Sequence, residues 1–222
     1  MAYPYAGVLF DLDGTLLDTE GIILESFHHA VKTVLGRDYP DEVLSKKVGQ
    51  PLAVQMWDFT DDAAVHDELL RTYRAYNEAI HDSAVSAFAG VVDALRALHE
   101  SDVRLGVVTS KRHALAVRGL EVCGVAPYLA FVIGSDDWET HKPDPGPVLH
   151  GCDLLGLEPA ACLYVGDSPY DLQAGRGAGC DTAAALWGMF PAAVLEAERP
   201  DYELSGIAEL LAVTRRTIAP AW

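Results

Sequence analysis

Two carboxylates follow the first apolar segment of the chain with a single residue between them. Residues 7–18 read Gly-Val-Leu-Phe-Asp-Leu-Asp-Gly-Thr-Leu-Leu-Asp, so Asp11 and Asp13 end an apolar run that is typical of a buried strand. If the chain stays extended, both carboxylates share one face, and Gly14 then allows a sharp turn. Two such charges repel each other and are costly to bury unless a cation or hydrogen-bond donors lie nearby. The pattern therefore predicts a metal ion or lysine side chains beside the pair, although an isolated Asp-x-Asp-Gly is also compatible with an ordinary turn.

The composition of the chain narrows the classes of partner. Half of its 222 residues are apolar, which is enough for a substantial core, and the formal net charge is −17 with a pI near 4.6. This charge argues against nucleic acid or an anionic membrane as a partner. It also repels anionic substrates at long range, so a phosphate site must be built from local cations and backbone amides. The start of the chain lacks the basic and apolar regions of a signal peptide, and no apolar run reaches the ~20 residues of a membrane span, so we expect a cytoplasmic protein.

The cysteines are scattered along the chain. None forms a Cys-x-x-Cys pair or has a histidine at metal-ligand spacing, and each lies in an apolar or Ala/Gly-rich context. We therefore expect buried thiols rather than metal ligands or disulfides. The four residues are Cys123, Cys152, Cys162 and Cys180.

Residues 18–86 predict an all-helical segment. Thr19 is a candidate cap for a first helix that ends at Gly36, short helices are expected over 41–47 and 52–59, and a long amphipathic helix follows Thr60. Most polar side chains of this segment are expected on the helix surfaces; they include His28, His29, Lys46, Lys47, Arg71 and Arg74.

From Gly90 onward, strands alternate with helices. Strands are expected over 103–109, 131–134, 161–166, 182–186 and 202–204, and helices over 91–99, 112–123, 147–155, 168–178 and 191–198, with a last helix capped by Ser205. Such alternation implies βαβ units and a parallel sheet covered by helices on both faces. We predict a Rossmann-like α/β core domain of residues 1–17 and 87–222, with residues 18–86 inserted as a helical cap domain after the first strand.

Polar clusters follow four of the predicted strands. In open α/β sheets, ligands bind beyond the carboxyl ends of the strands. Besides the two carboxylates of the first strand, these ends carry Thr109-Ser110-Lys111, then Lys142 across a loop after the strand over 131–134, and Asp167 with Asp171 after the strand over 161–166. The sequence therefore predicts that these side chains meet at one edge of the sheet.

These motifs resemble the haloacid dehalogenase-like (HAD) superfamily, and within it the phosphoglycolate phosphatase-like branch with a helical cap. The resemblance rests on four motifs in order: Asp11-x-Asp13-Gly14-Thr15, Thr109, Lys142-Pro143 and Gly166-Asp167-Ser168-x-x-Asp171. They span nearly the whole chain. The resemblance implies a magnesium-dependent phosphatase that hydrolyses a small phosphorylated metabolite, with phosphoglycolate as the suggested type of substrate.

The resemblance also implies a role for each residue. Asp11 would attack phosphorus and form an aspartyl-phosphate, and Asp13 would protonate the leaving group and then deprotonate the hydrolytic water. Mg²⁺ would be bound by the Asp11 side chain, the Asp13 backbone carbonyl and Asp167, with Asp171 in a supporting role. The phosphoryl group would be bound by the Thr109 hydroxyl, the Ser110 backbone amide and Lys142. Three further residues complete the set: Gly14 and Thr15 support the first motif, and Gln50, in a turn similar to the Gly-x-Pro-Leu turn of related caps, is the leading specificity candidate.

Plainer interpretations remain open for several of these residues. Thr109 or Asp167 could cap the helix that follows it, and Lys142 could be a solvated surface charge. Lys111 and Arg112 are expected to be exposed, although they could attract substrate locally.

The function also has alternatives. A sugar phosphomutase of the same fold would carry the same carboxylates, and a non-catalytic module that binds phosphorylated metabolites is a third hypothesis. Dehalogenases and phosphonate-cleaving relatives are disfavoured because both lack the acid-base aspartate that Asp13 supplies. We expect a monomer or a small homo-oligomer.

Overall fold

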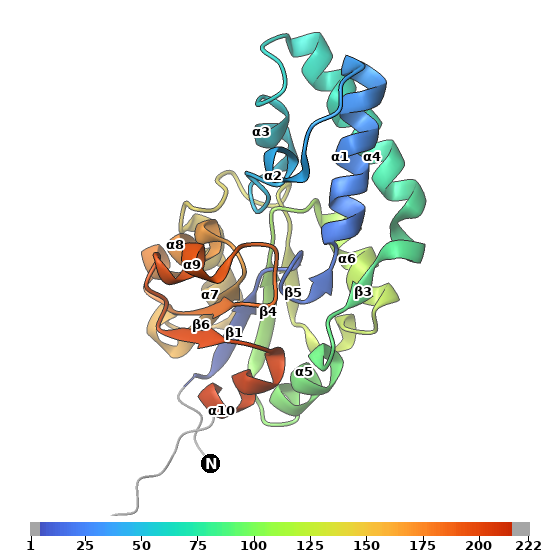
Figure 1. The fold of residues 1–222 in the computed structure, drawn as a ribbon. Coiled ribbons are helices and arrows are strands. Elements are labelled where there is room, and N and C mark those ends of the chain that lie inside the picture. The colour runs from blue at the N-terminus through green and yellow to red at the C-terminus, as the bar shows by residue number, and fades with distance from the viewer. Residues whose placement is uncertain (1–4, 215–222) are drawn as a thin grey trace, which may run out of the picture.

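A single sheet of six parallel strands forms the centre of the protein, which we describe from a computed structural model covering residues 5–214 (Figure 1). The strand order β5-β4-β1-β6-β7-β8 places β1 between β4 and β6. This arrangement confirms the predicted α/β fold with a parallel sheet. The strands are β1 (Gly7–Phe10), β4 (Arg104–Val108), β5 (Phe131–Ile133), β6 (Cys162–Gly166), β7 (Asp181–Ala185) and β8 (Tyr202–Leu204).

The register of the central strands brings three of the predicted motifs to one edge. Phe10 of β1 pairs with Val107 of β4 and Val165 of β6, so the three strands end at nearly the same level. Asp11, Thr109 and Asp167 follow directly after these ends. Parallel pairing therefore gathers residues that are far apart in the sequence at a single edge of the sheet.

Helices cover both faces of the sheet, as the alternation of elements predicts. On one face, α5 (Val91–His99), α6 (His113–Val122) and α10 (Leu210–Thr214) pack against Val8 and Phe10 of β1. On the other face, α7 (Gly146–Leu155) and α8 (Pro169–Ala178) pack against Leu9. Alternate side chains of β1 thus enter two different cores, which explains why the strand is apolar throughout. The connections after β7 and β8 contain the short α9 (Ala192–Glu196) and the 3₁₀ turn Ile207–Glu209.

Four helices form an insert after the first strand, with a core of their own. Phe27 of α1, Met56 of α3 and Leu69 of α4 are all fully buried in this second core. Figure 1 shows these helices at one end of the sheet, away from α5 and α10. The helices are α1 (Glu20–Leu35), α2 (Asp41–Leu44), α3 (Leu52–Met56) and α4 (Ala63–Ala84).

Two short strands that the sequence did not predict join the insert to the sheet. β2 (Leu17–Asp18) pairs antiparallel with β3 (Ser86–Ala87), with Leu17 opposite Ala87. The two connections between insert and core therefore lie side by side. The predicted domain boundaries, at 17/18 and 86/87, fall within this pair; the division into two domains stays a prediction.

Some predicted helix starts were wrong in detail. Thr19 occupies the N-cap position of α1, but its side chain makes no capping hydrogen bond. The long helix α4 follows Thr60 as predicted, and its cap is Asp62, whose carboxylate accepts hydrogen bonds from the Ala64 and Val65 amides. The last helix begins with a 3₁₀ turn after Gly206 instead of a Ser205 cap. Helix caps depend on side-chain orientation, which the spacing of residues does not determine.

All four cysteines are free thiols, and the predicted burial holds for three of them. Cys152, Cys162 and Cys180 are buried, and none of the four is in a disulfide, whereas Cys123 is half-buried. The Cys152 and Cys180 sulfur atoms lie 3.6 Å apart without a bond. Among the described helices, none is both long and apolar enough to cross a membrane.

Candidate active site

A tight turn places the two carboxylates at the end of β1. The Asp11 amide still donates to Val165 of β6, at 2.9 Å, so Asp11 remains fixed to the sheet. Gly14 then adopts a φ of 82°, which favours glycine, and its amide donates to the Leu17 carbonyl at 2.9 Å. Asp11 is only 4% exposed, whereas Asp13 is partly exposed. The turn predicted at Gly14 is therefore present, and it separates the surroundings of the two carboxylates.

Lys142 is the cation at the centre of this acidic cluster. Its ammonium nitrogen lies 2.8 Å from Asp11 Oδ1 and 2.5 Å from Asp171 Oδ1. It also lies 3.2 Å from both the Val108 carbonyl and the Tyr164 hydroxyl. The interpretation of Lys142 as a solvated surface charge is therefore wrong. Because a buried ammonium needs hydrogen-bond acceptors, the same contacts fix the position of this side chain.

The cluster carries more negative charge than Lys142 offsets. Burial, followed by the neighbouring charge of Asp171, raises the pKa of Asp11 to about 7, and Lys142 opposes this shift. Burial, then the charges of Asp171 and Asp11, raise the pKa of Asp167 well above its ordinary value. Burial lowers the pKa of Lys142, but the Asp11 and Asp171 charges outweigh it and raise that pKa well above its usual value. A second cation would therefore stabilise the ionised carboxylates.

The carboxylates of Asp11, Asp167 and Asp171 are arranged as a divalent-cation site would require. Each offers an oxygen within 4.8 Å of the others, and all three are buried. Both Asp171 oxygens already accept hydrogen bonds: one from Lys142, the other from the Ser168 amide and hydroxyl. Lys142 thus pairs with one Asp171 oxygen and with Oδ1 of Asp11, whereas Asp167 accepts only from uncharged donors. Asp167 and the second oxygen of Asp11 are therefore the better candidates to hold an ion, and an all-oxygen donor set suits Mg²⁺. The Asp13 carboxylate pairs with Lys111 instead. The predicted contact between Asp13 and the ion would therefore be made by its backbone carbonyl.

Asp171 has a structural role as well as its place in the cluster. Ser168 and Asp171 form a capping box at the start of α8. The Asp171 amide donates to the Ser168 hydroxyl oxygen, and the Ser168 amide donates to the Asp171 carboxylate. The residue that caps this helix is thus Ser168 and not Asp167. Asp171 therefore fixes both the start of α8 and the Lys142 ammonium.

The loop after β7, which contains Trp187 and Met189 and was not predicted to reach the site, helps to hold Asp167. One Asp167 oxygen accepts from the Thr15 hydroxyl and the other from the Met189 amide, both at 2.9 Å. The Trp187 indole nitrogen donates to the Thr15 carbonyl at 3.0 Å. This loop follows β7, so the same strand-end rule that indicated the other motifs could have indicated it.

The segment after β4 binds both the sheet and the insert. The Thr109 hydroxyl oxygen accepts from the Lys111 amide at 3.1 Å, which leaves its own proton free to donate. Arg112 is the N-cap of α6, so Thr109 does not cap that helix. The Ser110 hydroxyl donates to the Gly49 carbonyl of the insert at 2.5 Å. Ser110 thus connects the turn over residues 48–52 to the end of the sheet.

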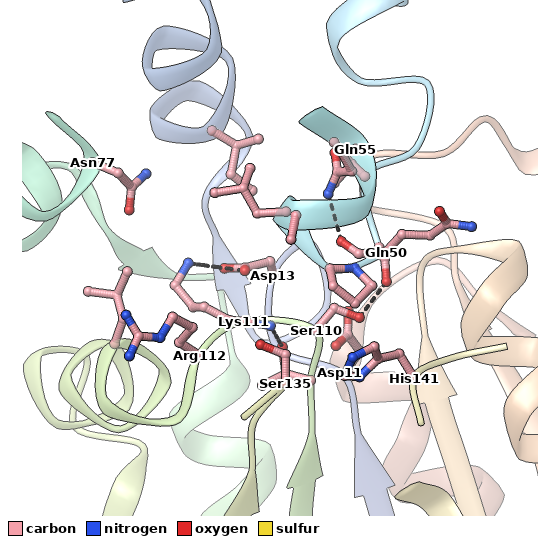
Figure 2. Close-up of a pocket in the computed structure, with 18 of the residues that line it drawn as sticks. Asp11, Asp13, Gln50, Gln55, Asn77, Ser110, Lys111, Arg112, Ser135 and His141 are labelled. Atoms are coloured by element: carbon pink, nitrogen blue, oxygen red, sulfur yellow. Dashed lines mark hydrogen bonds and ion pairs between the residues drawn. The ribbon is translucent and has the colours of Figure 1, made fainter. Parts of the chain in front are cut away.

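A cavity of about 340 Å³ lies between the sheet edge and the insert. Figure 2 shows Asp11, Asp13, Lys111, Ser110, Ser135 and His141 on its core side, with Gln50, Gln55 and Asn77 on the insert side. The Gln50 carbonyl accepts from Gln55 Nε2 at 2.6 Å, while the Gln50 side chain points away from Asp11. Gln50 is among the residues that line the cavity, but its role in specificity stays a prediction. Arg74, expected on the surface, also lines the cavity.

Lys111 is the functional candidate that sequence analysis undervalued. Its ammonium nitrogen lies 2.9 and 3.0 Å from the two Asp13 carboxylate oxygens, and its side chain is only 9% exposed. The expectation that Lys111 is exposed is therefore wrong, whereas Arg112 is more than half exposed as expected. Its position at the end of a strand was a signal for the site, but its pairing with Asp13 was not predictable, because the two residues are 98 apart in the sequence.

Replacing Gly14 with alanine tests how closely the turn approaches Asp167. A Cβ atom at Gly14 would lie 2.2 Å from Asp167 Oδ2, at a φ that alanine rarely adopts, so Asp167 must move. We expect Gly14→Ala to lower kcat/KM for phosphate release by about 100-fold, since misplacement by 1 Å can have that effect. Gly36→Ala is the matched control: it also has a positive φ but no atom within 4 Å, and should cost about 1 kcal/mol of stability with unchanged activity. Equal activity of the two variants would contradict the close approach.

Comparison with known proteins agrees with this geometry. Residues 8–185 match the family described as haloacid dehalogenase-like hydrolase. The chain belongs to this family. A relative from Caldanaerobacter subterraneus subsp. tengcongensis is 38% identical over 208 residues, covering 94% of each protein. The pyrophosphatase PpaX of Anoxybacillus flavithermus is 35% identical over 206 residues, covering 93% of this chain and 95% of the relative.

Solved structures show the same fold. A protein from Haemophilus somnus 129pt, described as a predicted phosphoglycolate phosphatase, superimposes with a TM-score of 0.89 at 23% identity, covering 96% of this chain and 99% of that one. Because the superposition covers 96% of this chain, the helical insert is part of the shared fold. Family membership confirms the prediction of an enzyme: the chain is a hydrolase of this family.

Proposed function

We propose that the protein is a Mg²⁺-dependent phosphatase that hydrolyses a small phosphorylated compound through an aspartyl-phosphate on Asp11. The observation that carries this proposal is the convergence of Asp11, Asp167 and Lys142 beneath a cavity that Asp13 also lines. The arrangement combines a nucleophile, an acid-base group and cationic neutralisation, the three requirements of phosphoryl transfer.

The proposed reaction has two steps. An Asp11 oxygen forms a bond to phosphorus while the bond from phosphorus to the leaving oxygen breaks, and Asp13 donates a proton to that oxygen. A water molecule then attacks phosphorus, Asp13 accepts its proton, and the bond between phosphorus and Asp11 breaks to release inorganic phosphate. Thr109 and the Ser110 amide would bind phosphoryl oxygens throughout. Mg²⁺, held by Asp11, Asp167 and the Asp13 carbonyl, would neutralise phosphoryl charge.

The substrate is proposed to be small. The cavity has a volume of about 340 Å³, and the insert is fixed at its edge by the hydrogen bond from Ser110 to Gly49. Two substrate types fit this size: pyrophosphate, which the PpaX relatives' name indicates, and a phosphomonoester such as phosphoglycolate. A sugar phosphomutase remains an alternative, and so does a module that binds phosphorylated metabolites without turnover.

Phosphate release and its dependence on metal test the proposal. We expect the purified protein with Mg²⁺ to release inorganic phosphate from pyrophosphate, phosphoglycolate or an aryl phosphate, and excess chelator to abolish the release. Restoring Mg²⁺ after chelation is the control for irreversible damage. Transfer of phosphate between sugar positions without net release would instead support a mutase. Binding of these compounds in calorimetry without any turnover would support the non-catalytic module.

A further inference from the structure

We propose that Lys111 forms a leaving-group site that binds a second anionic oxygen of the substrate, a carboxylate or phosphate, and thereby frees Asp13 for proton transfer. The inference rests on the proposed function, since it concerns the leaving group of the same reaction. It names the substrate class as small phosphorylated anions whose leaving group carries its own negative charge.

The first observation is the ion pair between Lys111 and Asp13. The ammonium nitrogen lies 2.9 and 3.0 Å from the two carboxylate oxygens, so it engages the whole carboxylate. The side chains are 9% and 17% exposed, and water screens such a pair only in part. The group proposed to transfer protons is therefore held by a cation in this conformation of the protein.

The second observation is the position of Lys111 relative to the reacting groups. Figure 2 shows its ammonium on the far side of Asp13 from Asp11, toward Asn77 of the insert. The phosphoryl group would lie against Asp11, and Asp13 must reach the leaving oxygen. The remainder of the leaving group then extends into the part of the cavity that Lys111 lines.

The third observation concerns the other charges around this part of the cavity. Lys142 is committed to Asp11 and Asp171 below the cavity, so it is not available to the leaving group. Arg74 of α4 and Arg112 also line the cavity, together with the acidic Glu78 and Asp136. Lys111 is the mostly buried cation among these groups, and a buried charge discriminates more strongly than an exposed one.

These observations imply an exchange of ion-pair partners. An anionic leaving group can replace Asp13 as the partner of Lys111, so that the carboxylate is released without leaving a buried ammonium unpaired. A neutral leaving group cannot replace Asp13 as the partner of Lys111. The reaction must then either break the ion pair between Lys111 and Asp13 or proceed while Lys111 still holds Asp13. Binding energy from the non-reacting end of the substrate would thus be used for catalysis, which raises kcat/KM selectively for anionic leaving groups.

A matched pair of substrates tests the inference. Phosphoglycolate and its carboxamide analogue have nearly the same size but differ in the charge of the leaving group. With Mg²⁺ present, we expect the wild-type kcat/KM to be about 10-fold or more higher for phosphoglycolate, as expected for one charged hydrogen bond. Lys111→Met should bring this ratio close to one, and Lys111→Arg should retain most of it. Lys46→Met, which removes an exposed lysine of the insert, is the control and should keep the wild-type ratio.

The outcomes separate the inference from the proposed function. A wild-type ratio near one, or an unchanged ratio in Lys111→Met, would overturn the role of Lys111. Equal loss of activity toward both substrates in Lys111→Met would also overturn it, because a purely structural role has that effect. If Lys111→Met fails to fold, Lys111→Gln supplies the same comparison, with circular dichroism as the check. Absence of any phosphate release by the wild type, including from an aryl phosphate, would instead reject the proposed function.

Discussion

Asp11→Asn is expected to lower the rate of phosphate release by about 1,000-fold or more, because it removes the proposed nucleophile while Asp13 and Asp167 are held by other partners. An amide oxygen is a poor nucleophile, and the substitution also removes a ligand from the proposed cation site. The fold should be retained, since asparagine has the same shape as aspartate. Burial raises the Asp11 pKa to about 7, so the charge removed is one that the folded protein tolerates poorly. The measurement is kcat for phosphate release, with the melting temperature recorded in parallel.

The control for this variant removes a different carboxylate from the same cavity. Glu78 of α4 is exposed and lines the cavity, and we assign it no role in the reaction. Glu78→Gln should keep activity within about twofold, in line with the small effect of an exposed charge. Activity of Asp11→Asn within tenfold of wild type would show that Asp11 is not the nucleophile.

Lys142→Met is expected to destabilise the protein by about 3–5 kcal/mol, the usual cost of removing one partner of a buried ion pair. Asp11 and Asp171 would lose the ammonium that lies 2.8 and 2.5 Å from their oxygens, while both remain buried. Turnover should also be lost, because Asp11 is no longer held in place. Added Mg²⁺ should recover part of the stability, since a divalent cation also neutralises these carboxylates. Urea unfolding with and without Mg²⁺ gives the change in the free energy of unfolding.

Lys47→Met is the matched control for the loss of a lysine ion pair. Lys47 pairs with Asp58 on the insert, and both side chains are about one third exposed. Its loss should therefore cost less than about 1 kcal/mol, because water screens the pair and solvates the remaining carboxylate. If the two variants were equally stable, Lys142 would not neutralise the buried cluster in the way its contacts indicate.

The local sequence determined the fold class and most of the candidate site. Apolar runs bounded by polar residues predicted the strands, and their alternation with amphipathic stretches implied a parallel sheet. Parallel strands place their carboxyl ends together, so the positions of Asp11, Thr109 and Asp167 after three strands were sufficient to predict that they lie at one edge of the sheet. The turn at Gly14 was also predictable, because it depends only on neighbouring residues.

Only the tertiary structure decided which polar groups pair with one another. Lys142 and Asp11 are 131 residues apart, and Lys111 and Asp13 are 98 apart. The Lys142-Pro143 motif indicated Lys142 as a site residue but not the carboxylates it pairs with, and no local pattern indicated the partner of Lys111. The Met189 amide, the contact between Ser110 and Gly49, and the orientation of Gln50 likewise depend on how loops pack. Backbone periodicity determines which face a residue occupies, whereas side-chain partners depend on the positions of distant segments in three dimensions. The sequence by itself therefore determined the edge of the sheet at which chemistry could occur, and the packing of the insert against that edge decided which cation each carboxylate meets.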